Sequence, residues 1–456
     1  MTQSLQDKID AAGNPAAMLH SSQVGPYVFP VAPEFSNWRD EQEAWNTTAI
    51  LFDQSNHMTD LYVEGPDTVR LLSELGINGF RNFGRNKAKQ FVACNHDGQV
   101  IGDAILFGLK DDRVNIVGRP HVPDWVEFNA GAGGYDVRVE RDERSIANPA
   151  GRKTYRFEIQ GPKAWAILEH VNGGPIADFK FFSMGEIRIA GRPVRALKHG
   201  MAAAPGLEIW GPREEGEEVR AHILEAGREF GLLQGGARAY STASTESGWF
   251  ASVLPAIYTG EKLRPYREWL GAGSWEATAS LGGSFYSDAI EDYYSTPWDI
   301  GYDFVDFGHD FIGREALLAS RDAPHLKKVT LTWDIDDVVR IFRSQFSEGD
   351  QRFKYMDMPA SHYATFPFDS VMIGGRRVGV STYPVYSSNV RRWVSLSLVP
   401  SEIAMGTAVS ILWGEPNGGS PRPVVERHRQ TEVRAEVGPS PLPAKAREGY
   451  RPYAST

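Results

Sequence analysis

The sequence predicts an α+β fold with two related lobes followed by a C-terminal β-rich region. Short alternating apolar runs and helically spaced runs are mixed, without the regular strand–helix–strand spacing of a doubly wound sheet. One strand–turn–helix pattern occurs twice, and short strands dominate after residue 320. Because 456 residues exceed what one simple core usually holds, we expect two or three packed lobes.

The first half of the chain carries the strands and helices of the two lobes. Alternating apolar residues that end at Gly, Asn or Asp predict strands at Met58–Val63, Lys89–Ala93, Val100–Phe107 and Arg113–Val117. Apolar residues at helical spacing predict helices at Thr68–Leu75, Lys163–His170 and Glu217–Phe230.

Two segments of the chain resemble each other. Leu61–Leu72 and Phe157–Leu168 both run from a strand through a Gly-Pro turn into a helix. Proline suits the turn and the start of the helix, where its missing N–H costs little. The pair suggests two related lobes, although similarity over so short a stretch also arises by chance.

Beyond Asp310–Leu317 the chain becomes β-rich. Turns of Gly, Pro and Asn separate strands predicted at Lys328–Trp333, Ser370–Met372, Val378–Thr382, Arg392–Leu398 and Ala408–Trp413. We therefore expect an α+β region of two interleaved lobes at 1–320 and a β-rich domain at 321–436. The remaining residues, 437–456, are rich in Pro, Ala and charge, which favours an extended tail.

Composition and charge narrow the class of protein. Hydrophobic residues make up 41% and charged residues 23%, as in ordinary globular proteins. A net charge of −10 argues against nucleic acid or an anionic membrane as the main partner. The single cysteine, Cys94, lies in a predicted buried strand and cannot form an internal disulfide, which fits a reducing compartment. Without a signal-like N-terminus or an apolar stretch of membrane length, we predict a cytoplasmic location.

Common catalytic motifs do not occur in the sequence. No GxGxxG follows a strand, and there is no Walker loop or Gly-x-Ser-x-Gly elbow. The histidines lack HExxH or similar spacing, so no metal site is predicted.

Two segments carry polar residues that suit binding of an acid. Arg119 closes a predicted strand just before Pro120, where its guanidinium can bind a carboxylate with two hydrogen bonds; a solvated loop arginine is the ordinary alternative. Gln54, Asn56, His57 and Asp60 lie among apolar residues, and Gln54 and Asn56 share a face only if the whole segment is extended. A hydrogen-bonded core histidine is an equal alternative for His57.

Two carboxylates interrupt apolar strands, and a polar segment carries large aromatic residues. Glu208 and Asp103 lie among apolar neighbours, where a carboxylate is costly unless it meets donors. A heterocycle with adjacent donors would satisfy Glu208, and a buried ion pair is the alternative. Tyr240 and Trp249 lie in the polar segment Gly236–Trp249, where they can also cap the core with their polar ends outward.

Taken in order, these segments resemble the aminomethyltransferase (glycine-cleavage T-protein) superfamily. The shared motifs are the two Gly-Pro units, Gly102–Asp103, Gly206–Ile209, Gly236–Arg238 with Glu246–Gly248, and Asp310–Leu317. A closer similarity, to the vanillate and syringate O-demethylases, covers nearly the whole chain at Gly25–Pro30, Glu34–Trp38, Asn86–Gln90, Gly118–Arg119, Pro205–Pro212, Glu246–Trp249 and Glu291–Tyr294.

The resemblance implies a three-lobed aminomethyltransferase-like fold with a barrel-like C-terminal domain, and a tetrahydrofolate-dependent methyltransferase. Such an enzyme moves the methyl group of a methoxylated aromatic acid to tetrahydrofolate. It implies Tyr240 as the catalytic residue, and residues that hold the aromatic acid: Tyr27, Phe29, Gln54, His57 and Arg119. Relatives can carry tyrosine at the position of Phe29. The residues implied for the folate are Gln90, Asp103, Val117, Glu208 and Trp249.

The implied chemistry explains the need for a phenolic acid. An aryl ether releases phenoxide poorly, and a tyrosine with a pKa of about 10 is matched to the departing phenol. The alternatives are another folate-dependent one-carbon transferase, such as an aminomethyltransferase or a sulfonium demethylase, and a non-catalytic folate-binding protein. Relatives of the last kind carry a Lys-Gly-Cys motif that this chain lacks.

Overall fold

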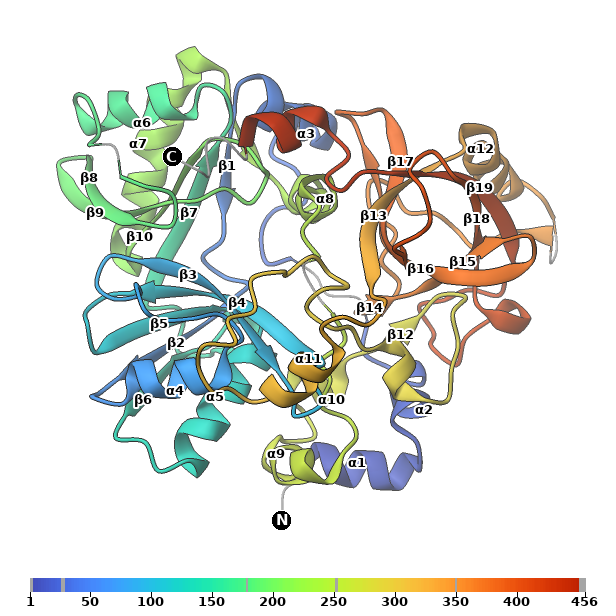
Figure 1. Ribbon diagram of the computed structural model, residues 1–456. Helices are drawn as coiled ribbons and strands as arrows, with labels where there is room; N and C mark the ends of the chain where they lie inside the picture. The colour runs from blue at the N-terminus through green and yellow to red at the C-terminus, as the bar shows by residue number, and fades with distance from the viewer. Residues whose placement is uncertain (1–2, 26–28, 178, 251–252, 349–350, 451–456) are drawn as a thin grey trace.

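The computed structural model describes residues 3–25, 29–177, 179–250, 253–348 and 351–450. Figure 1 shows two lobes, each built on a β-sheet, beside a C-terminal barrel. Within the described residues, no helix has both the length and the apolar content needed to cross a lipid bilayer.

The first sheet has six strands in the order β11-β1-β7-β10-β9-β8. On one face, buried residues of β7 such as Phe157 and Ile159 pack against α6 (Ala164–Asn172) and α7 (Gly216–Gly227). A 3₁₀ turn over Arg228–Phe230 replaces the last turn of the helix predicted there. The strands are β1 (Ala49–Asp53), β7 (Thr154–Gln160), β8 (Met184–Ile189), β9 (Arg192–Lys198), β10 (Gly206–Pro212) and β11 (Leu232–Gly235).

The second sheet has five strands in the order β3-β4-β5-β2-β6. Because β1 belongs to the first sheet and β2–β6 to the second, the chain passes between the lobes and returns, so the lobes are interleaved in sequence. The strands are β2 (Thr59–Glu64), β3 (Ala88–Cys94), β4 (Val100–Gly108), β5 (Arg113–Gly118) and β6 (Arg138–Asp142). All four strands predicted in this region are confirmed, and Cys94 is fully buried at the end of β3.

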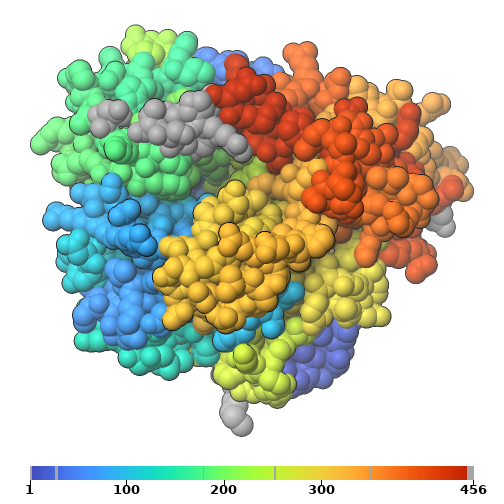
Figure 2. All heavy atoms as spheres, viewed as in Figure 1, coloured from blue at the N-terminus to red at the C-terminus, as the bar shows by residue number. Residues whose placement is uncertain are grey.

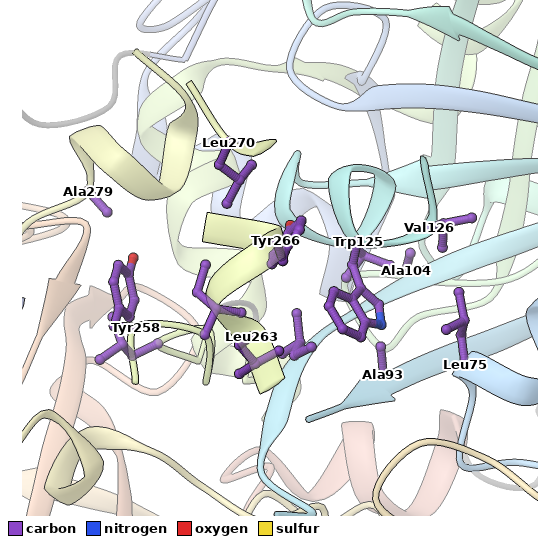
Figure 3. Close-up of a cluster of buried hydrophobic side chains, with 14 of the residues drawn as sticks. Leu75, Ala93, Ala104, Trp125, Val126, Tyr258, Leu263, Tyr266, Leu270 and Ala279 are labelled. Carbon is purple, nitrogen blue, oxygen red and sulfur yellow. The ribbon is translucent and has the colours of Figure 1, made fainter. Parts of the chain in front are cut away.

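Helices and aromatic residues cover the second sheet. Its helices are α4 (Thr68–Leu75), as predicted, and α5 (His121–Ala132). Figure 3 shows Trp125 of α5 beside Tyr266 of α9 (Arg264–Trp269), and their ring centroids are 5.0 Å apart in an edge-on arrangement. This cluster also buries residues of the N-terminal helices α1 (Leu5–Ala12) and α2 (Pro15–His20), so the start of the chain completes the second lobe.

The Gly-Pro repeat lies at equivalent places in the two lobes. Gly65 joins β2 to α4 with φ +150°, and Gly161 joins β7 towards α6 with φ +134°. A Cβ added to Gly65 would lie 2.3 Å from the backbone oxygen of Asp136, and one added to Gly161 would lie 2.6 Å from that of Thr48. Each turn therefore requires glycine because neighbouring backbone lies against it. The prediction of two related lobes is confirmed.

The C-terminal region forms a closed barrel in the order β13-β17-β16-β15-β18-β19. Three tryptophans fill its core: Trp333, Trp393 and Trp413. Its elements are β13 (Leu326–Trp333), α12 (Ile335–Ser344), β15 (Asp369–Ile373), β16 (Arg376–Ser387), β17 (Arg392–Pro400), β18 (Ala408–Trp413) and β19 (Thr431–Gly438). In the segment expected to be an extended tail, β19 runs on to Gly438 and Ala446–Tyr450 are helical.

The lobes and the barrel meet along shared elements. Thr245 Oγ1 on α8 (Ala237–Ser247) donates to the backbone oxygen of Tyr383 on β16 at 3.2 Å. Helix α3 (Trp38–Thr47) packs beside α8. Residues 298–317, which include the start of α11 (Arg314–Ser320), pack between β3 and the barrel and cover the centre of the face in Figure 2. The smaller elements are α10 (Trp275–Thr278), β12 (Leu281–Gly282) and β14 (Phe366–Pro367).

The two sheets face each other through a small apolar cluster. Phe107 and Val117 of the second sheet meet Leu197 and Trp210 of the first. The same face of the first sheet carries the polar residues of β7, because Arg156, Glu158 and Gln160 alternate with the apolar residues that face α6 and α7. A polar stripe therefore runs into the space where the two lobes and α8 converge.

Candidate active site

Tyr240 on the first turns of α8 lies at the centre of the candidate site. Its hydroxyl is 3.0 Å from Nε2 of His57 and 3.5 Å from Nε2 of Gln54. The ring of Phe29 lies 4.4 Å from the Tyr240 ring and 4.6 Å from the His57 ring, centroid to centroid. The structure thus brings together four residues implied for catalysis and substrate binding, whereas Tyr27 lies outside the described residues.

Local structure around Tyr240 and His57 differs from a simple extended chain. The polar segment that carries Tyr240 is a helix, ended by Gly248 at φ +71°. Gln54 and His57 lie in the turn between β1 and β2. The side chains of Gln54 and Asn56 therefore do not share one face of an extended strand. Asn56 instead offers its backbone oxygen to Ser145.

His57 is neutral at ordinary pH. Burial lowers the pKa of His57 to about 3. The positive charges of nearby arginines act on this pKa in the same direction: Arg119, Arg152 and Arg156. A neutral imidazole has one nitrogen that donates and one that accepts. His57 Nε2 can therefore accept from the Tyr240 hydroxyl or, in the Nε2–H tautomer, donate to the Tyr240 oxygen, and in neither case does it take the tyrosine proton.

Arg119 lies directly after β5 and before α5, at the strand end where the sequence predicted it. It is half-buried, and its charge influences His57, Asp103 and His362. A guanidinium in this position gives the site a fixed positive charge. Val117, two residues earlier on β5, packs in the apolar cluster between the sheets.

Asp103 is hydrogen-bonded to two of the other residues implied for the folate, Gln90 and Trp249. Its Oδ2 accepts hydrogen bonds from Gln90 Nε2 at 2.9 Å, from Trp249 Nε1 at 3.2 Å and from the Tyr302 hydroxyl at 2.7 Å. Burial raises the pKa of Asp103, and these three hydrogen bonds oppose the rise. Tyr302 was not predicted, because no motif marks it and its partner lies 199 residues away.

Glu208 forms the buried ion pair that the sequence left as an alternative. Its Oε1 accepts from Nη1 of Arg156, and Nη2 of Arg156 donates to Asp60 Oδ1 at 3.0 Å. Arg152 also pairs with Asp60, which is fully buried. Glu208 is 4% exposed at the face between the lobes, and the pair with Arg156 holds its charge there.

Arg156 and Glu158 on β7 belong to the site but were not predicted. Gln54 Nε2 donates to Glu158 Oε2 at 2.6 Å, so Glu158 lies directly behind a residue implied for substrate binding. Charged residues within the apolar strand Tyr155–Gln160 are the same signal that marked Glu208. Applied to β7, this signal would have found both residues.

The chain is similar in sequence to proteins of known family. Residues 15–253 match the family model described as the GCVT N-terminal domain. The chain is 48% identical over 454 residues to a syringate O-demethylase from a Sphingobium strain, covering 99% of this chain and 98% of the relative. It is 31% identical over 430 residues to a sesamin methylene transferase from a Sinomonas strain, covering 90% and 89%.

The fold also matches a solved structure. The crystal structure of the glycine cleavage system aminomethyltransferase T from Bartonella henselae superposes with a TM-score of 0.60 at 18% identity, covering 94% of this chain and 97% of that one. The expected three-lobed fold with a C-terminal barrel is therefore confirmed.

Proposed function

The chain belongs to the family of the GCVT N-terminal domain, and from this premise we propose that it is a tetrahydrofolate-dependent O-demethylase of a methoxylated aromatic acid. The proposed substrate is of the syringate or vanillate type, and the relative that matches over 98% of its length is a syringate O-demethylase. The observation that carries the proposal is the Tyr240 hydroxyl beside a neutral His57.

The residues around Tyr240 suit an aromatic acid. Phe29 and His57 offer ring faces close to Tyr240, where a flat substrate can stack. Arg119 supplies the charge that a benzoate carboxylate needs, and guanidinium binds carboxylate with matched geometry. Gln54, and by family resemblance Tyr27, would contact the ring substituents.

The residues around Asp103 suit a pterin. Asp103 Oδ1 accepts no hydrogen bond from the described residues, and Glu208 is a second acceptor at the same face. Two carboxylates match a ring rich in N–H donors, and Gln90, Val117 and Trp249 would complete its binding. Bound tetrahydrofolate supplies the nitrogen nucleophile that accepts the methyl group.

A basic cavity beside β3 suits the carboxylates of the rest of the folate. The cavity has a volume of about 530 Å³, and Phe182 and Asp306 are among the residues that line it. Its cationic residues are Arg81, Lys87, Lys89 and Lys180. A group of positively charged side chains attracts an anionic ligand, such as the carboxylates of folate.

Tyr240 would act as the general acid. As the bond between the methyl carbon and the aryl oxygen breaks, Tyr240 donates its proton to that oxygen. Neutral His57 in its Nε2–H tautomer would donate a hydrogen bond to the Tyr240 oxygen and hold it in place. Acid catalysis of this kind contributes a factor of about 10²–10⁴. Alignment of the two reactants by Arg119, Gln54 and the folate residues can contribute roughly 7–11 kcal/mol.

The first prediction tests the reaction itself. Purified protein should demethylate syringate or vanillate only when tetrahydrofolate is added, with one 5-methyltetrahydrofolate formed for each phenol released. Liquid chromatography of both products measures this ratio. Demethylation that proceeds without folate, or that requires oxygen and NADH, would contradict the proposed function.

A further inference from the structure

Glu158 is a buried carboxyl group, and none of the cations that the structure describes pairs with it. It lies on β7, in the middle of the first sheet between β1 and β10 (Figure 1), and is 0% exposed. Among the described residues it forms no ion pair, whereas Glu208, directly opposite on β10, is paired with Arg156. An isolated buried carboxylate is costly unless donors surround it. The cost of burying Glu158 therefore calls for an explanation.

One oxygen of Glu158 has fixed partners. Oε1 accepts from Met201 N at 2.8 Å and from Gln160 Nε2 at 2.6 Å. A backbone N–H can only donate. The Gln160 amide is also fixed, because its Oε1 accepts from Ala202 N at 2.7 Å, which leaves Nε2 to face Glu158.

Within the described part of the chain, the other oxygen of Glu158 accepts a hydrogen bond from Gln54 alone. Gln54 Nε2 lies 2.6 Å from Glu158 Oε2, while Gln54 Oε1 is buried and has no hydrogen-bond partner among the described residues. The remaining contacts of the Gln54 amide are weaker, at 3.5 Å to the Tyr240 hydroxyl and 3.7 Å to the Met201 sulfur. Glu158 is therefore the group that determines which end of this amide faces it.

From these contacts we propose that Glu158 is a positioning residue whose ionisation decides whether Gln54 presents its carbonyl oxygen or its N–H groups beside Tyr240. Ionised Glu158 holds Gln54 Nε2 and leaves Oε1 as an acceptor. Protonated Glu158 donates from Oε2, which draws Gln54 Oε1 towards it and leaves the N–H groups as donors.

This orientation selects the substituent next to the reacting methoxyl group. If the methoxyl oxygen lies at the Tyr240 hydroxyl, the neighbouring ring position lies close to Gln54, because the two groups are 3.5 Å apart. A free hydroxyl there donates to Gln54 Oε1, so ionised Glu158 favours a 4-hydroxy-3-methoxybenzoate. The inference rests on the proposed function and specifies its substrate preference.

The electrostatic surroundings make this preference depend on pH. Burial raises the pKa of Glu158 well above its ordinary value, and the charge of Glu208 raises this pKa further. His57 and His199 also lie near this site, and burial lowers the pKa of each and keeps both neutral. Arg156 is engaged by Glu208, and the Tyr240 hydroxyl lies 3.5 Å from Gln54 Nε2. The preference for a hydroxylated ring should therefore grow as the pH rises and Glu158 ionises.

Glu158→Gln tests the proposal with little change in shape. The new side chain keeps one oxygen for Met201 N and Gln160, and it places an NH₂ group against Gln54. Gln54 must then turn its oxygen away from the substrate. We expect the ratio of Kd for 3-methoxybenzoate to Kd for 4-hydroxy-3-methoxybenzoate, measured by titration calorimetry, to fall roughly tenfold at the upper end of the pH range. The ratio in the variant should no longer change with pH beyond the titration of the phenol itself.

Two further variants separate positioning from a general loss of structure. Gln54→Met removes the amide and should abolish the wild-type pH dependence, and in that background Glu158→Gln should no longer alter the ratio. Glu276→Gln is the matched control, because Glu276 is also fully buried with a raised pKa but bonds to Tyr266 in the core of the second lobe.

The outcomes distinguish the two proposals. If the wild type binds neither acid, the proposed function fails and this inference falls with it. If the wild type binds and demethylates both acids but Glu158→Gln leaves their affinity ratio and its pH dependence unchanged, only the role of Glu158 is overturned. If Glu158→Gln does not fold, a Gln54→Met variant that keeps the pH-dependent preference overturns it equally.

Discussion

At the scale of single residues, the hydroxyl and the ring of Tyr240 have different contacts and different roles. His57 holds it from one side at 3.0 Å, and the ring packs on Phe29 and Phe52. Removal of the hydroxyl alone should preserve this packing, so binding of both ligands should survive. A proton donated only as the C–O bond breaks stabilises the transition state, and its loss should appear in kcat.

We therefore expect Tyr240→Phe to lower kcat by a factor of about 10²–10⁴ with little change in KM. The deficit should shrink for methoxybenzoates whose ring substituents make the departing phenol more acidic, since a better leaving group needs less help. A series of such substrates, assayed with wild type and variant at saturating folate, measures this trend. A deficit that is constant across the series would assign Tyr240 to substrate positioning, and an unchanged kcat would remove it from the mechanism.

At the scale of elements, the Gly-Pro turns set the spacing between each strand and its helix. Gly161 holds φ +134° with backbone of Thr48 against it. Gly161→Ala should lower the free energy of unfolding by at least about 3 kcal/mol, since it adds a backbone collision to an unfavourable φ. Gly173, which ends α6 at φ +77°, has no atom within 4 Å of an added Cβ.

Gly173→Ala is thus the matched control and should cost only about 1 kcal/mol. Urea unfolding followed by tryptophan fluorescence compares the two variants. Equal losses would show that the conformation alone, and not the close approach of Thr48, makes glycine necessary at Gly161.

At the scale of the whole molecule, α8 joins the lobes to the barrel through a buried acid. Glu246 Oε2 accepts from Trp45 Nε1 of α3 at 3.2 Å and from Asn389 Nδ2 of the barrel at 2.9 Å. Burial raises the pKa of Glu246 from 4.5 to about 7, against the opposing effect of side-chain hydrogen bonds from Ser387, Asn389 and Trp45. The protonated form is therefore the one that the folded state prefers.

Because the pKa of Glu246 is higher in the folded than in the unfolded state, its contribution to stability is complete below pH 4.5 and is lost as the pH rises through about 7. The loss amounts to about 3 kcal/mol. Glu246→Gln cannot ionise, so its unfolding free energy should fall less than that of the wild type over this pH range. Parallel slopes for the two proteins in chemical denaturation would contradict the assignment.

Local features of the sequence determined the elements and part of the site. Alternating and helical apolar patterns depend on near neighbours, so strands such as β4 and helices such as α4 could be predicted within a few residues. Arg119 at its strand end and the glycines of the two turns were visible for the same reason. Resemblance of ordered motifs added the fold family and implied site roles for Tyr240, His57 and Gln54.

Tertiary structure alone decided which of these residues meet. Tyr240 and His57 are separated by 183 residues, and Tyr302 and Asp103 by 199, so no local period records either contact. The environment of each charge was decided in the same way. Glu208 is paired because β10 lies beside β7, which carries Arg156. The donors that the structure describes around Glu158, also on β7, are all uncharged, and that difference arises from the packing of strands distant in sequence.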